Sequence, residues 1–556
     1  MRRSKSPPIA GISGFLLILV ALFAAQLGLD NDAGWGGGRL LILKAGIALL
    51  VLEAFLRIFR EFILNIQGRT SAMAGYIGRD RSLLIVFAAS VLLTAGAYNW
   101  FLRDADDAGI IYNYYSELAR GFKRGNLHLS QEPSTRLLAL ENPYDPVLRK
   151  QAGVEDFPWD VSLYEGRFYI YWGPVPAAAL MPFNDAALAK IEDFHLALVY
   201  AFGLFVYCAW IATSFWRSLK NAPIWAFSIL LLVFGFSMPV TIMLGRGEVY
   251  EAAIFASQFF FIGGCYWAYS SMRDEAPPAW KFAMASAHWA LAVGSRALIL
   301  PAVAAAMLVM IYPILSGFLA KNRVPSDWGM RLRLLSAAGI PLLAGVSALA
   351  WYNHARFDSI LEFGIRYQLA NVDYTRFDAS FGARYLLENL RIYFLEPVVF
   401  QPRFPYLLMS EYQPSNSRIA GLFYAAPFIV LILLPLVRSI FAVRQPAVAT
   451  QVNKRTLALF AGAALASAAA IFFFYFIALR YTLDFLPSAL ILIALSLGME
   501  YESLGAPRPA EKALSLIFIV LALANVTMGV LLAFPPEGKA FMLNLLNALG
   551  KLPGVR

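Results

Sequence analysis

Three aspartates stand close together at the end of an apolar run: Asp104, Asp106 and Asp107. Carboxylates at the mouth of a helical bundle meet a lowered dielectric, where they can act as general bases. A second interpretation stays open, in which they are solvated and one caps the helix predicted over residues 110–122. The Asp-x-Asp spacing of Asp104 and Asp106 could also hold a divalent metal ion with other oxygen ligands, although this short pattern is common.

Three arginines lie where apolar runs end, in connections that carry few other basic residues: Arg246, Arg296 and Arg480. A guanidinium binds phosphate through two parallel N–H groups, so these residues are candidates for a phosphate site. They could instead extend toward lipid headgroups. The four histidines show no metal-ligand spacing, so we predict no zinc site.

Aromatic residues and carboxylates gather between residues 159 and 176. Apolar faces of sugar rings stack on aromatic side chains, and sugar hydroxyls bond to carboxylates, so Trp159, Asp160, Tyr164 and Tyr169 are candidate sugar contacts. An aromatic belt at a membrane interface would have the same composition. Within this stretch, Glu165 and Gly166 predict a tight hairpin turn.

The composition determines the class of protein that must position these residues. Of 556 residues, 59% are hydrophobic and only 15% are charged, which excludes a soluble enzyme, a disordered scaffold and a nucleic-acid binder. Apolar runs long enough to cross a bilayer recur, and two weaker runs bring the total to about 13. The runs are residues 9–29, 40–59, 83–102, 194–216, 223–244, 249–271, 282–295, 298–320, 334–353, 419–443, 456–479, 481–499 and 513–534. We therefore predict an all-α polytopic membrane protein with about 13 transmembrane helices.

Lysine and arginine concentrate in alternate connections, which places the N-terminus in the cytoplasm. The two longest connections, residues 103–193 and 354–418, are then extracytoplasmic, and they hold 21 of the 36 acidic residues. Their aromatic content predicts folded loops. We expect an N-terminal transmembrane hairpin with a cytoplasmic loop over residues 1–82, a transmembrane core over residues 83–534 and a tail over residues 535–556.

Four sequence features together resemble the GT-C superfamily of integral-membrane glycosyltransferases. An acidic cluster opens the first long loop, and a tyrosine-rich helix follows it. A Tyr-x-Gly-like hairpin runs into prolines. An arginine ends a short apolar run, and an Arg-Tyr element precedes a proline near the end of the core. The residues are Asp104, Asp106, Asp107, Tyr112, Tyr115, Leu118, Gly121, residues 164–182, Arg296 and residues 480–487. The chain departs from the family at residues 171–174, where many bacterial relatives carry a lysine.

The resemblance implies an inverting transfer of a sugar from a polyprenyl-phosphate donor to a hydroxyl of a lipid, glycan or protein. One of Asp104, Asp106 and Asp107 would be the base, while Arg296, Arg480 or Arg246 would bind the donor phosphate. The reaction would take place on the extracytoplasmic face of a bacterial cytoplasmic membrane, among membrane lipids and without nucleic acid. No cofactor is expected except a divalent metal ion at the aspartates.

A transporter or lipid flippase without chemistry is the alternative interpretation. Transporters place ionisable residues near mid-membrane and show internal repeats. In this chain the acids gather in the outer loops and no repeat is visible, which favours the enzyme. A catalytically inactive subunit of an assembly is a third interpretation.

Overall fold

The computed structural model describes residues 72–106, 113–245, 249–319, 328–376, 381–401, 406–412, 417–435, 451–504 and 509–534, with short stretches between residues 13 and 49. The chain divides into two compact units. One comprises Met1–Arg81, Pro402–Pro405 and Pro535–Arg556, and the other comprises Ser82–Gln401 and Tyr406–Phe534. The second unit contains every contact discussed below.

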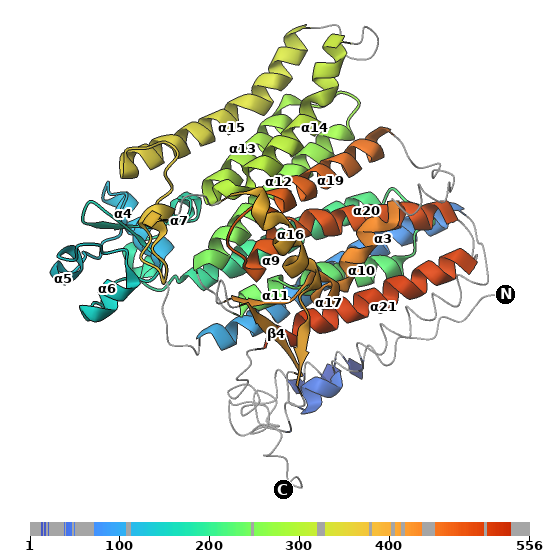
Figure 1. Cartoon of the computed structure of the whole chain (residues 1–556). Coiled ribbons are helices and arrows are strands. Elements are labelled where there is room, and N and C mark those ends of the chain that lie inside the picture. The colour runs from blue at the N-terminus through green and yellow to red at the C-terminus, as the bar shows by residue number, and fades with distance from the viewer. Residues whose placement is uncertain are drawn as a thin grey trace. The chain divides into compact units, whose positions relative to one another are not determined.

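Long apolar helices make up most of the second unit, and the first of them belongs to it from Ser82 on (Figure 1). They are α3 (Ala72–Asp106), α9 (Asp193–Trp216), α10 (Ile224–Phe236), α11 (Val240–Leu244), α12 (Val249–Met272), α13 (Ala279–Ser295), α14 (Leu300–Leu319), α15 (Trp328–Phe357), α19 (Gln451–Phe472), α20 (Leu486–Leu504) and α21 (Pro509–Leu531). Helix α12 packs against α9 and α13, and α13 packs against α15.

Six of the described helices are long and apolar enough to cross a membrane. They cover Gly78–Phe101, Asp193–Trp216, Ala297–Ser316, Trp328–Phe357, Lys454–Phe472 and Glu511–Leu531. The chain is thus a mostly helical membrane protein, as its composition predicts. The total of about 13 spans stays a prediction, and the runs over residues 9–29 and 40–59 lie mostly outside the described residues.

The apolar run over residues 223–244 is not one continuous helix. The structure has two helices there, α10 and α11, because Pro239 lacks the N–H that a continuous helix needs. The break packs against α21, where Asn525 donates to the Ser237 hydroxyl at 2.7 Å. Gly529 of α21 is required at this contact, since an added Cβ would lie 2.1 Å from the Phe236 carbonyl oxygen.

Two later runs also differ from the single helices that were expected. Residues 419–435 form the end of a strand, a short helix α17 (Leu422–Ala425) and a 3-10 helix η6 (Pro427–Leu433), and the rest of that run lies outside the described residues. Helix α19 ends at Phe472, where Asn389 donates to the Phe472 and Phe474 carbonyl oxygens at 2.9 and 2.7 Å. A 3-10 helix η7 (Leu479–Asp484) then precedes α20. This non-helical stretch between α19 and α20 carries Arg480.

Both long loops contain regular structure, as their aromatic content predicts. The first loop contains α4 (Tyr114–Lys123), α5 (Thr135–Leu138), α6 (Pro146–Gln151), β1 (Ser162–Tyr164), β2 (Arg167–Tyr169), α7 (Val175–Leu180) and α8 (Asp185–Leu188). Strands β1 and β2 pair antiparallel with Leu163 opposite Phe168. Glu165 and Gly166 both have positive φ, 46° and 71°, which confirms the predicted two-residue turn.

The second loop begins with three 3-10 helices and then forms a helix and a small sheet. Its elements are η2 (Ile365–Tyr367), η3 (Tyr374–Arg376), η4 (Ala383–Tyr385), α16 (Leu386–Leu395), β3 (Val398–Phe400), β4 (Leu407–Tyr412) and β5 (Ser417–Ile419). The strands are ordered β3-β4-β5, all antiparallel, with Val399 opposite Leu408. Asn389 on α16 reaches the end of α19, so this loop packs on the stretch that leads to Arg480.

Candidate active site

Arg480 lies in η7 with its guanidinium over two tyrosine rings. Its Cζ is 4.4 Å from the ring centroid of Tyr250 and 5.4 Å from that of Tyr481. Cation–π attraction of this kind holds a guanidinium in place and leaves its N–H groups directed around the ring edges. Tyr250 lies at the start of α12, so the arginine from the end of the core meets a helix more than 200 residues earlier in the chain.

Asp160 is the described carboxylate beside this arginine. The Tyr250 hydroxyl donates to its Oδ2, and the Gln368 side-chain amide donates to its Oδ1 at 2.7 Å. The backbone of Asp160 has φ of 60°, a left-handed conformation that costs free energy in a residue other than glycine. Two donors from two distant segments and a strained backbone therefore hold one carboxylate in a single orientation.

Aromatic residues surround the carboxylate and the arginine. Trp172 packs edge-on against Tyr250, with ring centroids 5.3 Å apart. Burial raises the pKa of the Tyr171 phenol well above its usual range, and the nearby Asp160 carboxylate raises it further. Burial also raises the pKa of Tyr374, whose hydroxyl accepts a hydrogen bond from Tyr475. Both phenols therefore stay protonated near neutral pH, so each keeps an O–H group.

We call this group the Asp160–Arg480 cluster. Its members come from the first loop, the start of α12, the second loop and η7. They are Asp160, Tyr171, Tyr250, Gln368, Tyr374, Arg480 and Tyr481.

Arg296 approaches the same cluster from the end of α13. Its Cζ lies 4.8 Å from the centroid of the Tyr481 ring, and its Nη1 lies 2.5 Å from Oδ2 of Asp484. Asp484 lies in the same 3-10 helix as Arg480, and its carboxylate forms a buried ion pair with Arg296.

An open apolar groove of about 710 Å³ lies beside the cluster. It is bordered by α13, α15, the C-terminal end of α4 and the start of α7. Lining residues include Phe122, Pro174, Val175, Ala290, Gly294, Ala348 and Tyr352.

A close backbone contact joins the groove to the cluster. The Gly173 N–H donates to the Ser295 carbonyl oxygen at 3.1 Å. An added Cβ at Gly173 would lie only 2.0 Å from the Gly294 carbonyl oxygen, so glycine is required. Trp172 and Arg296 flank this contact on the cluster side, and Pro174 and Gly294 flank it on the groove side. The groove therefore ends within two residues of Arg296.

The predicted acidic trio is only partly described. Asp104 and Asp106 lie in the last turn of α3, but their side chains and all of Asp107 lie outside the described residues, as does Arg246. The helix expected over residues 110–122 is α4, which begins at Tyr114, and the buried carboxylate of Asp193 accepts from the Tyr114 and Tyr115 N–H groups, both at 3.1 Å. Asp193 therefore satisfies the first N–H groups of this helix. The role of the trio stays a prediction.

The predicted sugar contacts divide into two groups. Asp160 belongs to the cluster, and Trp159 precedes it with an exposed ring and a carbonyl oxygen that accepts from the Tyr114 hydroxyl at 3.0 Å. Tyr164 packs against Tyr367, with centroids 4.8 Å apart. Tyr169 is only 6% exposed and packs against Phe357, so its ring belongs to the interior of the loops and is not presented to a ligand here.

Sequence reasoning missed Tyr250, Gln368 and Tyr374. Tyr250 had one weak signal, since it stands with Glu251 at the polar start of an apolar run. Gln368 and Tyr374 had none, because their contacts depend on how the two loops fold together. Among the described residues no group of three or more His, Cys, Asp or Glu side chains could hold a metal ion. A metal ion at Asp104 and Asp106 stays a prediction.

No protein-family model matches the sequence, and no curated protein matches it. Among solved structures, the chain is similar to the oligosaccharyltransferase of Archaeoglobus fulgidus in its apo form, with a TM-score of 0.43 and 14% sequence identity. The match covers 83% of this chain and 59% of the archaeal chain. This chain thus spans well under two thirds of the length of the archaeal protein.

Proposed function

We propose that this protein is a membrane glycosyltransferase that moves a sugar from a polyprenyl-phosphate donor to a hydroxyl acceptor on the extracytoplasmic face of a bacterial cytoplasmic membrane. One observation carries the proposal: an open apolar groove ends beside a cluster that contains a carboxylate, an arginine and aromatic rings, and a second arginine, Arg296, lies against the same cluster. A lipid-linked sugar has the same three parts in the same order: an apolar chain, an anion and a ring of hydroxyls.

The groove suits the chain of the donor. Its volume falls in the range of sites that bind small amphiphiles, and its lining along α13 and α15 is almost entirely apolar. A prenyl chain lying there would have its phosphate near the contact between Gly173 and Ser295, on the side where Arg296 and Arg480 both face Tyr481.

The two arginines suit different tasks. Arg296 is already neutralised by Asp484, so it adds hydrogen-bond donors but little net charge. Arg480 lies over the rings of Tyr250 and Tyr481, whose faces attract its guanidinium and fix where its charge lies. We assign Arg480 to the departing phosphate, whose charge grows as the bond to the sugar breaks. Arg246 stays a candidate for the same phosphate.

The reaction would be a direct displacement with inversion. The acceptor hydroxyl oxygen attacks the anomeric carbon from the face opposite the phosphate, and the bond between that carbon and the phosphate oxygen breaks. The electron pair of the broken bond stays on the polyprenyl phosphate. The acceptor proton passes to a carboxylate of the trio Asp104, Asp106 and Asp107 as general base.

Asp160 suits a different role from the base. Its two oxygens already accept from Tyr250 and Gln368, and such hydrogen bonds stabilise the charged form. A carboxylate can accept several hydrogen bonds, so a sugar or acceptor hydroxyl can donate to one that is held in this orientation. We therefore assign Asp160, with the exposed ring of Trp159 and with Tyr164 nearby, to binding of the reacting partners.

The first test is transfer by the purified protein in liposomes, supplied with polyprenyl-phosphate donors carrying different radiolabelled sugars and with an envelope lipid and glycan extract. We expect the Arg480→Ala variant to lose about 100-fold in kcat/KM, the cost of removing one donor to a developing charge. The matched control is Arg136→Ala, because Arg136 is an exposed arginine on α5.

Two results would overturn the proposal. If the unmodified protein moved a donor lipid between leaflets and transferred no sugar from any donor, the transporter alternative would replace the enzyme. If sugar transfer occurred equally in the Arg480→Ala and Arg136→Ala variants, the phosphate site would not be at the Asp160–Arg480 cluster.

A further inference from the structure

The two long loops are joined along residues 364–376, which we call the strap. The Leu369 N–H donates to the Val161 carbonyl oxygen at 2.8 Å, and the Asp160 N–H donates to the Leu369 carbonyl oxygen at 3.3 Å. The Ser162 hydroxyl donates to the Gly364 carbonyl oxygen at 2.8 Å. The strap therefore forms main-chain bonds with the very residue, Asp160, that its own Gln368 side chain also holds.

A buried cation fastens the middle of the strap. Arg149, on α6 of the first loop, is only 3% exposed. Its guanidinium donates to the Ala370 carbonyl oxygen of the strap and to the Pro143 carbonyl oxygen at 2.7 Å, and it lies 5.3 Å from the Phe157 ring centroid. Burying a charge costs free energy unless its hydrogen bonds are made, so Arg149 strongly favours the one loop arrangement that satisfies it.

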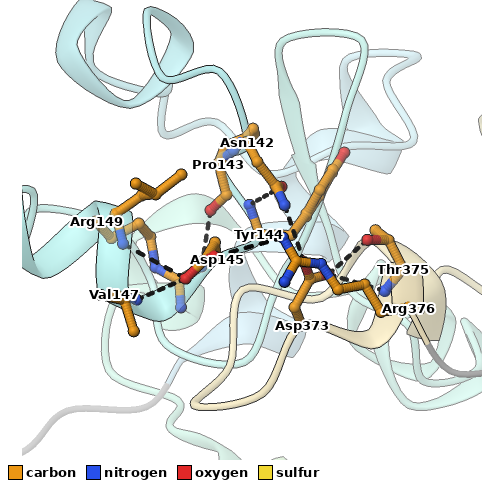
Figure 2. A network of polar contacts seen from close by, with 10 residues as sticks. Asn142, Pro143, Tyr144, Asp145, Val147, Arg149, Asp373, Thr375 and Arg376 are labelled. Atoms are coloured by element: carbon orange, nitrogen blue, oxygen red, sulfur yellow. Dashed lines mark hydrogen bonds and ion pairs between the residues drawn. The ribbon is translucent and has the colours of Figure 1, made fainter.

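A second fastening lies at the end of the strap (Figure 2). The Asn142 amide, in the first loop, donates to Oδ2 of Asp373 at 2.9 Å. Oδ1 of Asp373 accepts from the N–H and hydroxyl of Thr375, at 3.0 and 2.5 Å. Burial would raise the pKa of Asp373, but hydrogen bonds from Thr375 and Asn142 outweigh it and lower that pKa. The bonds from Thr375 set the turn that contains Tyr374, and the bond from Asn142 ties that turn to the first loop.

The two side chains that the strap positions lie on either side of these fastenings. Gln368, two residues before Ala370, holds Asp160, and Tyr374, directly after Asp373, hydrogen-bonds with Tyr475 and lies near Asp160 and Arg480. Among the described residues, the hydrogen bonds by which Asn142 and Arg149 reach the second loop end within the strap, on Asp373 and Ala370. These two residues therefore act on the cluster through the strap.

We infer that Asn142, Arg149 and Asp373 are positioning residues for the Asp160–Arg480 cluster: they fix the strap so that Gln368 orients Asp160 and Tyr374 meets the substrate. This inference rests on the proposed function, since it assigns the strap to sugar transfer. It predicts that loosening the strap slows the transfer step and leaves donor binding in the groove between α13 and α15 unchanged. Misplacement of reacting groups by about 1 Å can cost on the order of 100-fold in rate.

The experiment is an exchange of the two bonded side chains. Asn142→Asp places two carboxylates against each other and should lower kcat about 10- to 100-fold with the donor KM unchanged. In the double variant Asn142→Asp with Asp373→Asn, the amide and the carboxylate have changed places, so the bond re-forms in reverse, and only the ion pair between Asp373 and the exposed Arg376, 3.1 Å long, is lost. We expect kcat to return to within about threefold of the unmodified protein, because the restored bond is close to the original in geometry.

Two further measurements separate positioning from general damage. Hydrogen exchange followed by mass spectrometry should show faster exchange in residues 364–376 for Asn142→Asp and normal exchange for the double variant. The control Asp185→Asn removes an exposed ion pair with Lys123 within the first loop, and it should change neither exchange in the strap nor transfer.

The outcomes are distinct. If Asn142→Asp speeds exchange in the strap but leaves kcat unchanged, or if the double variant folds and stays slow, the positioning inference is overturned while the proposed function stands. If the unmodified protein transfers no sugar at all, the proposed function fails, and the assigned role of the strap fails with it. A rise in donor KM without a fall in kcat would also overturn the inference, because it would tie the strap to the groove.

Discussion

At the scale of single residues, Tyr250 contacts both charged members of the cluster. Its hydroxyl donates to Asp160, and its ring lies under the Arg480 guanidinium at 4.4 Å. One side chain therefore contacts both the carboxylate and the cation of the cluster and fixes where each of them lies.

Replacing Tyr250 with Phe tests this arrangement by removing only the hydroxyl. The ring stays under Arg480, while Oδ2 of Asp160 loses its donor, so we expect kcat/KM for sugar transfer to fall about tenfold, the equivalent of about 1.4 kcal/mol. The matched control is Tyr266→Phe on the same helix, where the hydroxyl accepts only a long bond of 3.4 Å from Trp210. Equal transfer by the two variants would show that the Tyr250 hydroxyl has no part in the site.

At the scale of elements, the contact between residues 171–175 and the end of α13 holds the groove and the cluster together. Gly173 lies against Gly294 and Ser295, so the two backbones touch with no side chain between them. The same short stretch carries Trp172 to the cluster and Val175 to the groove. A change in this contact should therefore affect the fold and both halves of the site at once.

Gly173→Ala measures the strength of this contact. The added methyl group would lie 2.0 Å from a carbonyl oxygen, and relieving that clash should cost about 1–3 kcal/mol. We expect a lower midpoint of thermal unfolding in detergent, together with reduced transfer. Gly339→Ala on α15 is the control, since a Cβ there meets nothing within 4 Å and alanine favours a helix. If the midpoint of thermal unfolding of Gly173→Ala were no lower than that of Gly339→Ala, the contact would accommodate the added methyl group at little cost in stability.

Local signals in the sequence predicted some elements well. The turn at Glu165 and Gly166 depends on two adjacent residues. Pro239 also broke its helix for a local reason that the hydropathy of residues 223–244 concealed. Partners far apart in the chain could not be predicted: Gln368 and Asp160 are separated by 208 residues, and Asp484 and Arg296 by 188. Their pairing depends on the packing of whole loops and helices.

At the scale of the second unit, the site combines parts that sequence reasoning had placed separately. The pattern predicted that Arg296 and Arg480 would serve one site, and both face Tyr481. No sequence feature located the groove beside the cluster. The groove becomes visible only where α13 and α15 pack with the first loop. The central claim is that this groove and the Asp160–Arg480 cluster bind the two ends of one donor.

The most direct test fills the groove without touching the cluster. Ala348 is an exposed residue of α15 that lines the groove, and Leu343 on the same helix is exposed outside it. Sugar transfer by Ala348→Trp and Leu343→Trp would be measured with long-chain and short-chain polyprenyl-phosphate donors. We predict that Ala348→Trp raises KM for the long-chain donor about tenfold or more, the effect of about 1.4 kcal/mol of lost apolar contact, with kcat and the short-chain donor little changed. If Ala348→Trp matched Leu343→Trp with both donors, the groove would not hold the donor chain and the account would be wrong.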